Sequence, residues 1–222
     1  MRRLTRIASV ALVTAGVVLL ADVAVTLLWK EPLSAVYAEI RQNQAAGELD
    51  AVSDEFLQDP DVADLTRSAA DSARRAEQLA DLFAKRLEEG KPIGRIEIPS
   101  IDADYVVVEG TAEADLERGP GHYPDAGLPG QGRTVAIAGH RTTYGAPFNE
   151  IDKIDAGDPI VLEMPYGKFT YEVTDTRIVD PDQTGIVDDV GHERLVLTSC
   201  HPLYSAAQRY AVIADLKRID LG

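Results

Sequence analysis

Short β-type runs fill the second half of this 222-residue chain and constrain its fold more than any other feature. Each run is rich in β-branched residues and partly alternates between apolar and polar positions, as half-buried strands do. A tight turn at 165–167, Pro-Tyr-Gly, separates two of them. Seven or eight strands in about 130 residues predict a mainly β fold, a closed or partly closed barrel with short helical connections. The runs are Ile93–Ile98, Tyr105–Glu109, Arg133–Ala138, Ile160–Met164, Phe169–Thr174, Leu195–Thr198 and Arg209–Leu216.

The N-terminal residues differ in composition from the β-rich half of the chain. An arginine-rich tail, residues 1–6, precedes an apolar stretch over residues 7–29. Its 23 residues suffice to cross about 30 Å of hydrocarbon as a helix, so they predict a transmembrane anchor. Asp22 opposes this assignment, because a carboxylate inside a bilayer costs about 2.5–3.5 kcal/mol. The basic tail places the N-terminus in the cytoplasm and everything from Lys30 onward outside.

A cleaved signal peptide is the alternative for the same stretch, with residues 7–20 as its apolar core. Signal peptidases require small residues at the −3 and −1 positions. Cleavage after Ala21 would place Leu19 at −3, and cleavage after Ala24 would place Asp22 there. The uncleaved anchor is therefore the favoured interpretation.

Residues 30–90 read as an extracytoplasmic linker that breaks at Pro32, Gly47 and Pro60. Apolar residues recur at helical spacing over 65–87, which predicts an amphipathic helix closed by Gly90. This helix is either a spacer that packs on the following domain or a lid or docking element. The domain that carries the chemistry is expected to span residues 91–222.

Charge and cysteine content exclude several functions. The formal net charge of −15 argues against a nucleic-acid partner, because a phosphate backbone is held by a basic face. Cys200 is the single cysteine, so neither an intramolecular disulfide nor a paired-cysteine zinc site can form.

Chemically versatile residues concentrate at the ends of two predicted strands, in AIAGHRTTYGAPF (136–148) and LVLTSCHPLYSAAQRY (195–210). His140 ends one strand, Cys200 ends another, and Arg209 begins the next. If the last two strands are antiparallel neighbours, their loop returns Arg209 to the rim where Cys200 lies. A thiol, an imidazole and a guanidinium would then converge.

These three groups together fit acyl transfer. A thiolate can attack a peptide carbonyl, an imidazole can protonate the leaving amine, and a guanidinium can hold the developing oxyanion. Each one alone is weak, since a lone cysteine is often a small buried hydrophobe and a lone arginine is often a surface residue.

The motifs A-G-H and L-T-S-C-H-P, with an arginine nine residues after the cysteine, resemble those of sortases. The string GHYP…LPGQG…VAIAGHRTTYGAPF is most similar to the class E housekeeping sortases of actinobacteria. The resemblance covers about residues 91–222. One departure is Val196-Leu197-Thr198-Ser199-Cys200, where sortases commonly have T-L-x-T-C.

The resemblance implies a membrane-anchored cysteine transpeptidase on an eight-stranded sortase barrel. No cofactor or metal is expected, and calcium dependence stays open. Its partners would be secreted proteins that carry an LPXTG-like sorting signal and a peptidoglycan-precursor amine. Cys200 would form a thioester with the signal's Thr, Arg209 would stabilise the oxyanion, and His140 would act as acid and then as base. The enzyme would lie at the cell membrane as a single-pass protein with its catalytic domain extracellular.

The resemblance also suggests substrate-binding residues: Tyr123, Thr198, Tyr144 and Ser199. Class E members favour LAXTG, and a tyrosine at the position of Tyr123 is associated with that choice; packing under a loop is the competing interpretation. His201 should point away from the face of Cys200 because side chains alternate along a strand. His122 and His192 read as loop residues.

Three alternatives stay open. A pilin-polymerising sortase would carry an Asp-Pro-aromatic lid, whereas the nearest string here is Asp59-Pro60-Asp61. A papain-type thiol protease is disfavoured because its cysteine precedes its histidine in the sequence. An envelope binding module without catalysis is disfavoured because it has no need of all three site residues. Four loop carboxylates lack the spacing of a calcium loop and read as a solvated face: Asp180, Asp182, Asp188 and Asp189.

Overall fold

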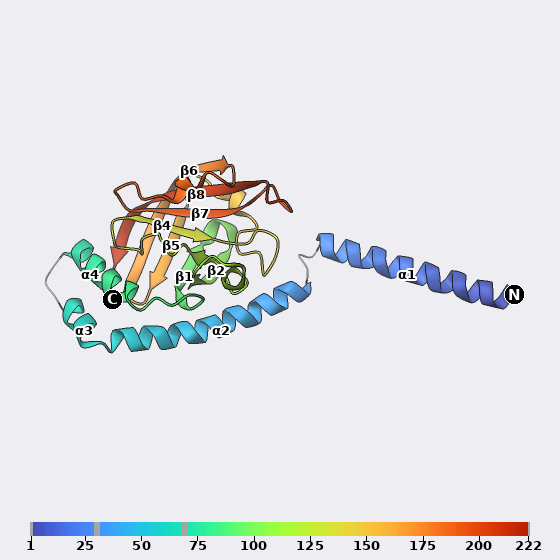
Figure 1. The fold of residues 1–222 in the computed structure, drawn as a ribbon, viewed down its shortest axis with the longest axis horizontal. Helices are drawn as coiled ribbons and strands as arrows, with labels where there is room; N and C mark the ends of the chain where they lie inside the picture. The colour runs from blue at the N-terminus through green and yellow to red at the C-terminus, as the bar shows by residue number, and fades with distance from the viewer. Residues whose placement is uncertain (1, 29–31, 68–70, 222) are drawn as a thin grey trace.

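The computed structural model of the chain describes residues 2–28, 32–67 and 71–221 (Figure 1). The helices are α1 (Arg2–Leu28), α2 (Pro32–Leu57), α3 (Pro60–Thr66), α4 (Ser72–Ala84) and α5 (Glu113–Leu116), with 3-10 turns η1 (Pro99–Ile101), η2 (Ile151–Lys153) and η3 (Thr184–Val187). The strands are β1 (Pro92–Ile98), β2 (Ala103–Glu109), β3 (Gly121–His122), β4 (Thr134–Ala138), β5 (Pro159–Met164), β6 (Gly167–Val179), β7 (Arg194–His201) and β8 (Gln208–Asp220).

The eight strands form a closed barrel in the order β1-β2-β3-β4-β7-β8-β6-β5 (Figure 1). The pairs β2–β3 and β4–β7 are parallel, and the other neighbours are antiparallel. The prediction of a mainly β barrel is confirmed, and so is the turn between β5 and β6. The sequence did not predict β3, because two residues are too few to show alternation.

Alternation along β7 separates the core from a second face. Leu195 and Leu197 lie in the hydrophobic core, where their cross-strand partners Ala214 and Val212 on β8 also lie. Residues 196, 198 and 200 therefore point to the opposite face of the sheet. Cys200 lies on this second face, near the C-terminal end of β7.

Helices α2 and α4 pack on the barrel, as Figure 1 shows for α2 along one side of it, and α3 packs against these two helices. The predicted break at Gly47 is wrong, because α2 runs through it. The single helix predicted over 65–87 is also wrong: α3 ends at Thr66, and α4 covers Ser72–Ala84. Two aspartates account for the actual starts, since Asp59 and Asp71 each accept a hydrogen bond from the backbone of the first turn.

The core is continuous from these helices into the barrel. Phe56 of α2 meets Phe83 of α4 edge to face at 5.2 Å between ring centroids. Phe83 lies 5.7 Å from Tyr166, which lies 5.6 Å from Phe169 of β6. Tyr166 is buried in the β5–β6 turn and donates its hydroxyl to the carbonyl of Pro129 at 2.9 Å. Residues on both sides of position 91 thus share one apolar cluster.

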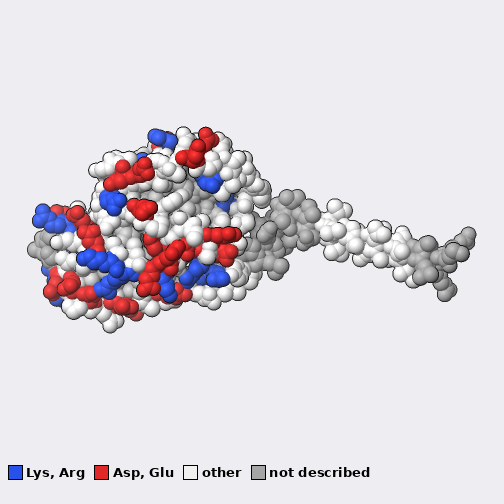
Figure 2. Space-filling model, viewed as in Figure 1, with Lys and Arg blue, Asp and Glu red and all other residues white. Residues whose placement is uncertain are grey.

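The predicted anchor, residues 7–29, and tail, residues 1–6, lie partly outside the described residues. Within the ranges that the structure describes, no helix combines the length and the apolar character needed to cross a bilayer. The charge of the chain is displayed in Figure 2, where acidic side chains spread over the visible face with basic ones among them.

Candidate active site

Cys200 and Arg209 are directly opposite each other. The last residues of β7 pair with the first residues of β8, and the register matches Cys200 with Arg209. Directly paired residues of antiparallel strands project to the same face. The predicted return of Arg209 to the rim of Cys200 is therefore realised by this hairpin, in which Cys200 is partly exposed.

His140 approaches the same rim from the other neighbour of β7. The parallel pairing of β4 with β7 ends at Ala138 opposite Thr198, and the amide of Gly139 still donates to the carbonyl of Thr198 at 3.0 Å. Carried two residues beyond the end of β4, the same register would set His140 level with Cys200 and on the same face of the sheet. The two residues of β4 on this face, Ala136 and Ala138, have small side chains.

Close packing holds the segment that carries His140. A side chain at Gly139 would place its Cβ 2.4 Å from the ring of Phe148, so only glycine fits there. Phe148 is buried, and its amide donates to the carbonyl of His140 at 3.0 Å. The imidazole Nε2 is buried and has no hydrogen-bond partner among the described residues. A buried ring nitrogen without a partner is uncommon in folded proteins and calls for an explanation.

Burial and two carboxylates act on His140 in opposite directions. Burial lowers the pKa of His140 from its ordinary value of 6.5, because the charged ring loses hydration. The negative charges of Glu113 and Glu117, on and just after α5, favour the imidazolium and oppose part of that shift. The net effect is a lowered pKa, which favours the neutral ring.

Tyr144 covers one side of His140. The two ring centroids are 5.0 Å apart. The backbone of Tyr144 has φ 51°, a left-handed conformation that is uncommon for a bulky residue. Its hydrogen bond to Glu117 is the largest of several causes that raise the pKa of Tyr144. The phenol is therefore a neutral wall of the site.

The guanidinium of Arg209 is oriented by its own loop. Its Nη1 donates to the carbonyls of Ala206 and Gln208, at 2.9 and 3.0 Å. These two bonds hold the guanidinium against the loop that joins β7 to β8. A planar cation held this way can bind an oxyanion without having to reorganise.

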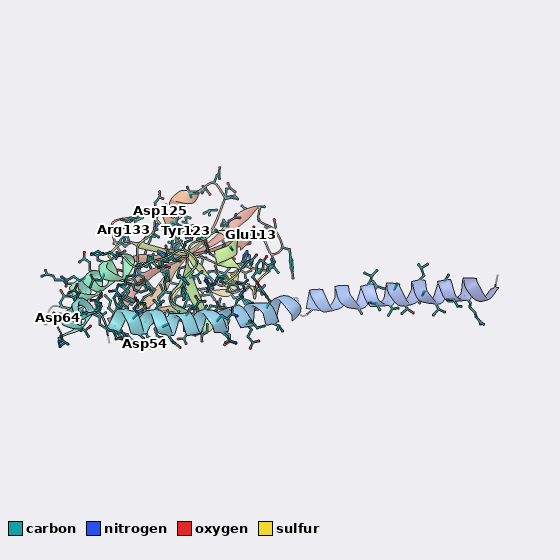
Figure 3. All side chains as sticks on the ribbon, turned by 60° about the horizontal axis from the view of Figure 1, so that its bottom comes forward. Asp54, Asp64, Glu113, Tyr123, Asp125 and Arg133 are labelled. Carbon is teal, nitrogen blue, oxygen red and sulfur yellow. The ribbon has the colours of Figure 1, made fainter. Side chains whose placement is uncertain are left out.

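Tyr123 and Thr198 meet on the face of Cys200. Their hydroxyl oxygens are 3.0 Å apart, and Thr198 is almost fully buried. Tyr123 also borders a cleft of about 460 Å³, together with Asp125 and Arg133, which Figure 3 labels beside it. The structure therefore brings Tyr123 and Thr198 together on the sheet face of Cys200, two residues before it along β7.

Ser199 and His201 project to the other face of β7. The hydroxyl of Ser199 is buried and donates to the carbonyl of Gly139 at 2.8 Å, so the fold itself uses it. Nδ1 of His201 lies 3.0 Å from Nη1 of Arg141. The predicted alternation at His201 agrees with this position.

The interpretation of His122 as a loop residue is wrong. It lies in β3 and is 1% exposed, with Nδ1 2.8 Å from the carboxylate of Glu109 and Nε2 3.0 Å from the carbonyl of Gly127. Both ring nitrogens thus hold the strand that leads into Tyr123. His192 lies in an exposed loop before β7, as expected.

Arg141 is the residue near this site that sequence reasoning missed. An arginine after a strand reads as a surface residue, yet the side chain of Arg141 is only 3% exposed. It bonds to the carbonyl of Cys200 and forms an ion pair with Asp152. Residue type and spacing gave no signal for it, because its partners come from distant parts of the chain.

The arrangement combines a thiol, a buried imidazole and an oriented guanidinium at one end of one sheet face. A nucleophile, a proton carrier and an oxyanion donor are the parts that acyl transfer requires. A carbonyl carbon placed over Cys200 would have His140 on one side and Arg209 on the other.

Comparison with known proteins agrees with this chemistry. Residues 96–217 match the family model for the sortase domain. Sortase D of Bacillus subtilis is 36% identical over 151 residues, which cover 66% of this chain and 74% of that protein. Sortase SrtE1 of Streptomyces coelicolor is 30% identical over 168 residues, 66% of this chain and 48% of that protein. The structure of sortase E from Streptomyces avermitilis superposes with a TM-score of 0.56 at 32% identity, covering 60% of this chain and 93% of that one.

Proposed function

Because this chain belongs to the sortase family of cysteine transpeptidases, we propose that it cleaves an LPXTG-like sorting signal on another protein and transfers that protein to an amine. The observation that carries the proposal is the register around β7. It pairs Cys200 with Arg209 on one side, and on the other side it ends at Ala138 opposite Thr198, two residues before His140.

We assign the nucleophile to Cys200, the proton carrier to His140 and the oxyanion donor to Arg209. His140 takes the thiol proton as the Sγ of Cys200 attacks the carbonyl of the signal's Thr, and the Thr–Gly bond breaks. His140 gives a proton to the departing Gly amine, so the acyl group stays on Cys200 as a thioester. An incoming amine then loses a proton to His140 and attacks the thioester, which frees the thiol. The unpaired Nε2 of His140 supports this shuttle.

The sorting signal that we propose is LAXTG rather than LPXTG. Tyr123 supports this choice, since its hydroxyl contacts Thr198 two residues before Cys200 and its ring borders the adjacent cleft. The signal residues that precede the Thr would lie along this wall. Tyr144, over His140, would form the opposite side.

For the acceptor we propose the amine of a peptidoglycan precursor, and for the location the outer side of the cytoplasmic membrane. The sequence supports the location through its basic tail and the apolar residues 7–29. Wall anchoring is preferred to pilin polymerisation because Asp59 caps helix α3 and pairs with Arg86, where a lid would need an aromatic plug.

A transfer assay tests this function. The full chain, in detergent, is incubated with a peptide containing LAETG and with an amine in excess. Mass spectrometry should show a product that ends at Thr and is joined to the amine, formed faster than from a matched LPETG peptide. Cys200→Ala should give none. Equal product from the wild type and Cys200→Ala would contradict the assignment.

The two histidines beside Cys200 provide a matched pair for the proton carrier. His140→Ala should lose turnover by about 10²-fold or more while the barrel stays folded by circular dichroism. His201→Ala removes a ring from the opposite face of β7 and should lose less. The reverse order would transfer the proton-carrier role to His201.

A further inference from the structure

Arg141 is a buried cation whose donors have partners on several segments. Its Nε donates to the carbonyl of Asn149 at 3.3 Å, and its Nη2 lies 2.6 Å from the carboxylate of Asp152. Its Nη1 donates to the carbonyl of Cys200 at 3.3 Å and to Nδ1 of His201 at 3.0 Å. Burial of a guanidinium is costly unless its donors are bonded, so this network accounts for how the charge is tolerated.

Arg141 lies just beyond the end of the β4–β7 pair, where its hydrogen bonds continue the links between the two segments. The paired residues of these parallel strands end at Ala138 and Thr198. Beyond that point the amide of Gly139 bonds to Thr198, and the hydroxyl of Ser199 bonds back to Gly139. Arg141 adds the next link, so the residue that follows the base bonds to the carbonyl of the nucleophile.

We propose that Arg141 is a positioning residue that holds His140 and Cys200 in their working register. The proposal rests on the roles proposed above for these two residues. Asp152 and the carbonyl of Asn149 hold the guanidinium, and Arg141 in turn fixes the end of β7. A planar fork with several donors is needed, because a lysine ammonium cannot span the carbonyl, the ring nitrogen and the carboxylate in one plane.

The contact with His201 gives Arg141 a second effect that can be measured. A guanidinium only donates, so Nδ1 of His201 accepts and the neutral ring carries its proton on Nε2. Arg141 therefore selects one tautomer of His201 and keeps its ring pinned away from the face of Cys200.

Kinetics of the full chain test the positioning role. Arg141→Lys keeps the charge for Asp152, and Arg141→Gln removes it. Both should lower kcat about 10- to 100-fold while KM changes less than about threefold. The reacting groups are then misplaced, whereas Tyr123 and Thr198, which we propose bind the peptide, are unchanged. Arg95→Gln is the control, because Arg95 pairs with Asp104 on the exposed surface, and it should leave both constants unchanged. Full kcat in both Arg141 variants would overturn the proposal.

A spectroscopic measurement separates positioning from folding. In the chain labelled with ¹⁵N-histidine, His201 should show the Nε2-protonated tautomer, and His201→Asn assigns its signals. Arg141→Gln should raise the Nδ1-protonated population, with thermal unfolding recorded alongside. Unchanged ¹⁵N shifts of His201 would overturn the proposal. If neither Arg141 variant folds, Asp152→Asn replaces them, with the same direction expected for kcat and for the tautomer, and unchanged values in both again overturning it.

These outcomes are distinct from failure of the proposed function. If Cys200→Ala still transfers peptide, the assignment of the nucleophile fails, whatever Arg141 does. If Cys200→Ala is inactive and Arg141→Gln is as active as the wild type, only the positioning role fails.

Discussion

At His140, burial and nearby charge compete, and the structure shows which one prevails. Burial lowers the pKa, whereas Glu113 and Glu117 raise it by a smaller amount. Below the folded pKa the ring is charged, and above it the ring is neutral. A ring that must alternately give and accept a proton benefits from a pKa that is not pushed far from neutrality.

The carboxylates near His140 yield a prediction with a definite sign. Glu113→Gln and Glu117→Gln each remove a negative charge that stabilises the imidazolium, so each should lower the pKa of His140 further below 6.5. An NMR titration of the ¹⁵N-histidine-labelled chain measures this directly. Glu163→Gln, at an exposed pair with Lys168, is the control and should leave the titration of His140 in place. A rise in the pKa of His140 in either site variant would contradict the account.

The sequence alone could bring forward Cys200, His140 and Arg209 as candidates, because each type has a chemical use and each lies at the end of a β-type run. The buried position of Arg141 could not be predicted that way. Its burial depends on Asp152 and on the carbonyls of residues 149 and 200, which only the fold brings together.

Among the elements, α2 takes the place of a strand for part of β2. Strand β3 pairs with β2 only at Val108 and Glu109, which leaves the backbone of Val106 without a strand on that side. The side-chain amide of Gln42 fills the gap: it accepts from the amide of Val106 at 2.7 Å and donates to its carbonyl at 3.2 Å. The same nitrogen donates to the carbonyl of Arg118 at 2.6 Å.

Gln42 should therefore matter to stability far more than a typical helix glutamine. Gln42→Ala leaves partly buried backbone groups unpaired, which should cost about 1–3 kcal/mol of the free energy of unfolding. Gln44→Ala is the matched control, because Gln44 lies on an exposed position of the same helix and should change little. Urea denaturation of both variants measures the difference. Equal stability of the two would show that the amide does not complete β2.

Strands were more predictable than helices in this chain for a physical reason. A barrel strand must alternate, so β-branched runs reported seven of the eight strands directly. Helix α2 has no strong apolar stripe and contains Gly47; apart from Phe56 near its end, it is held by small residues such as Ala45 and by the polar Gln42. Packing of this kind leaves no periodic signal in the sequence.

In the whole molecule, helices and barrel form a single apolar core under an acidic surface. Phe56, Val62 and Phe83 belong to the same cluster as the barrel residues Ile96 and Phe169. The helices before residue 91 therefore extend the apolar core of the barrel, in addition to any role as a linker. The surface in Figure 2 and the net charge of −15 disfavour anionic nucleic acids as partners.

If Cys200 carries the cleaved protein as a thioester, intact-mass spectrometry of the full chain should detect that intermediate. The full chain is mixed with the LAETG peptide without an amine and is quenched in acid after a fraction of a turnover. We expect an adduct equal to the peptide portion through Thr, located on Cys200, released by hydroxylamine and absent from Cys200→Ala. Cleavage of the peptide between Thr and Gly by the Cys200→Ala chain, or an acyl adduct on a different residue, would contradict it.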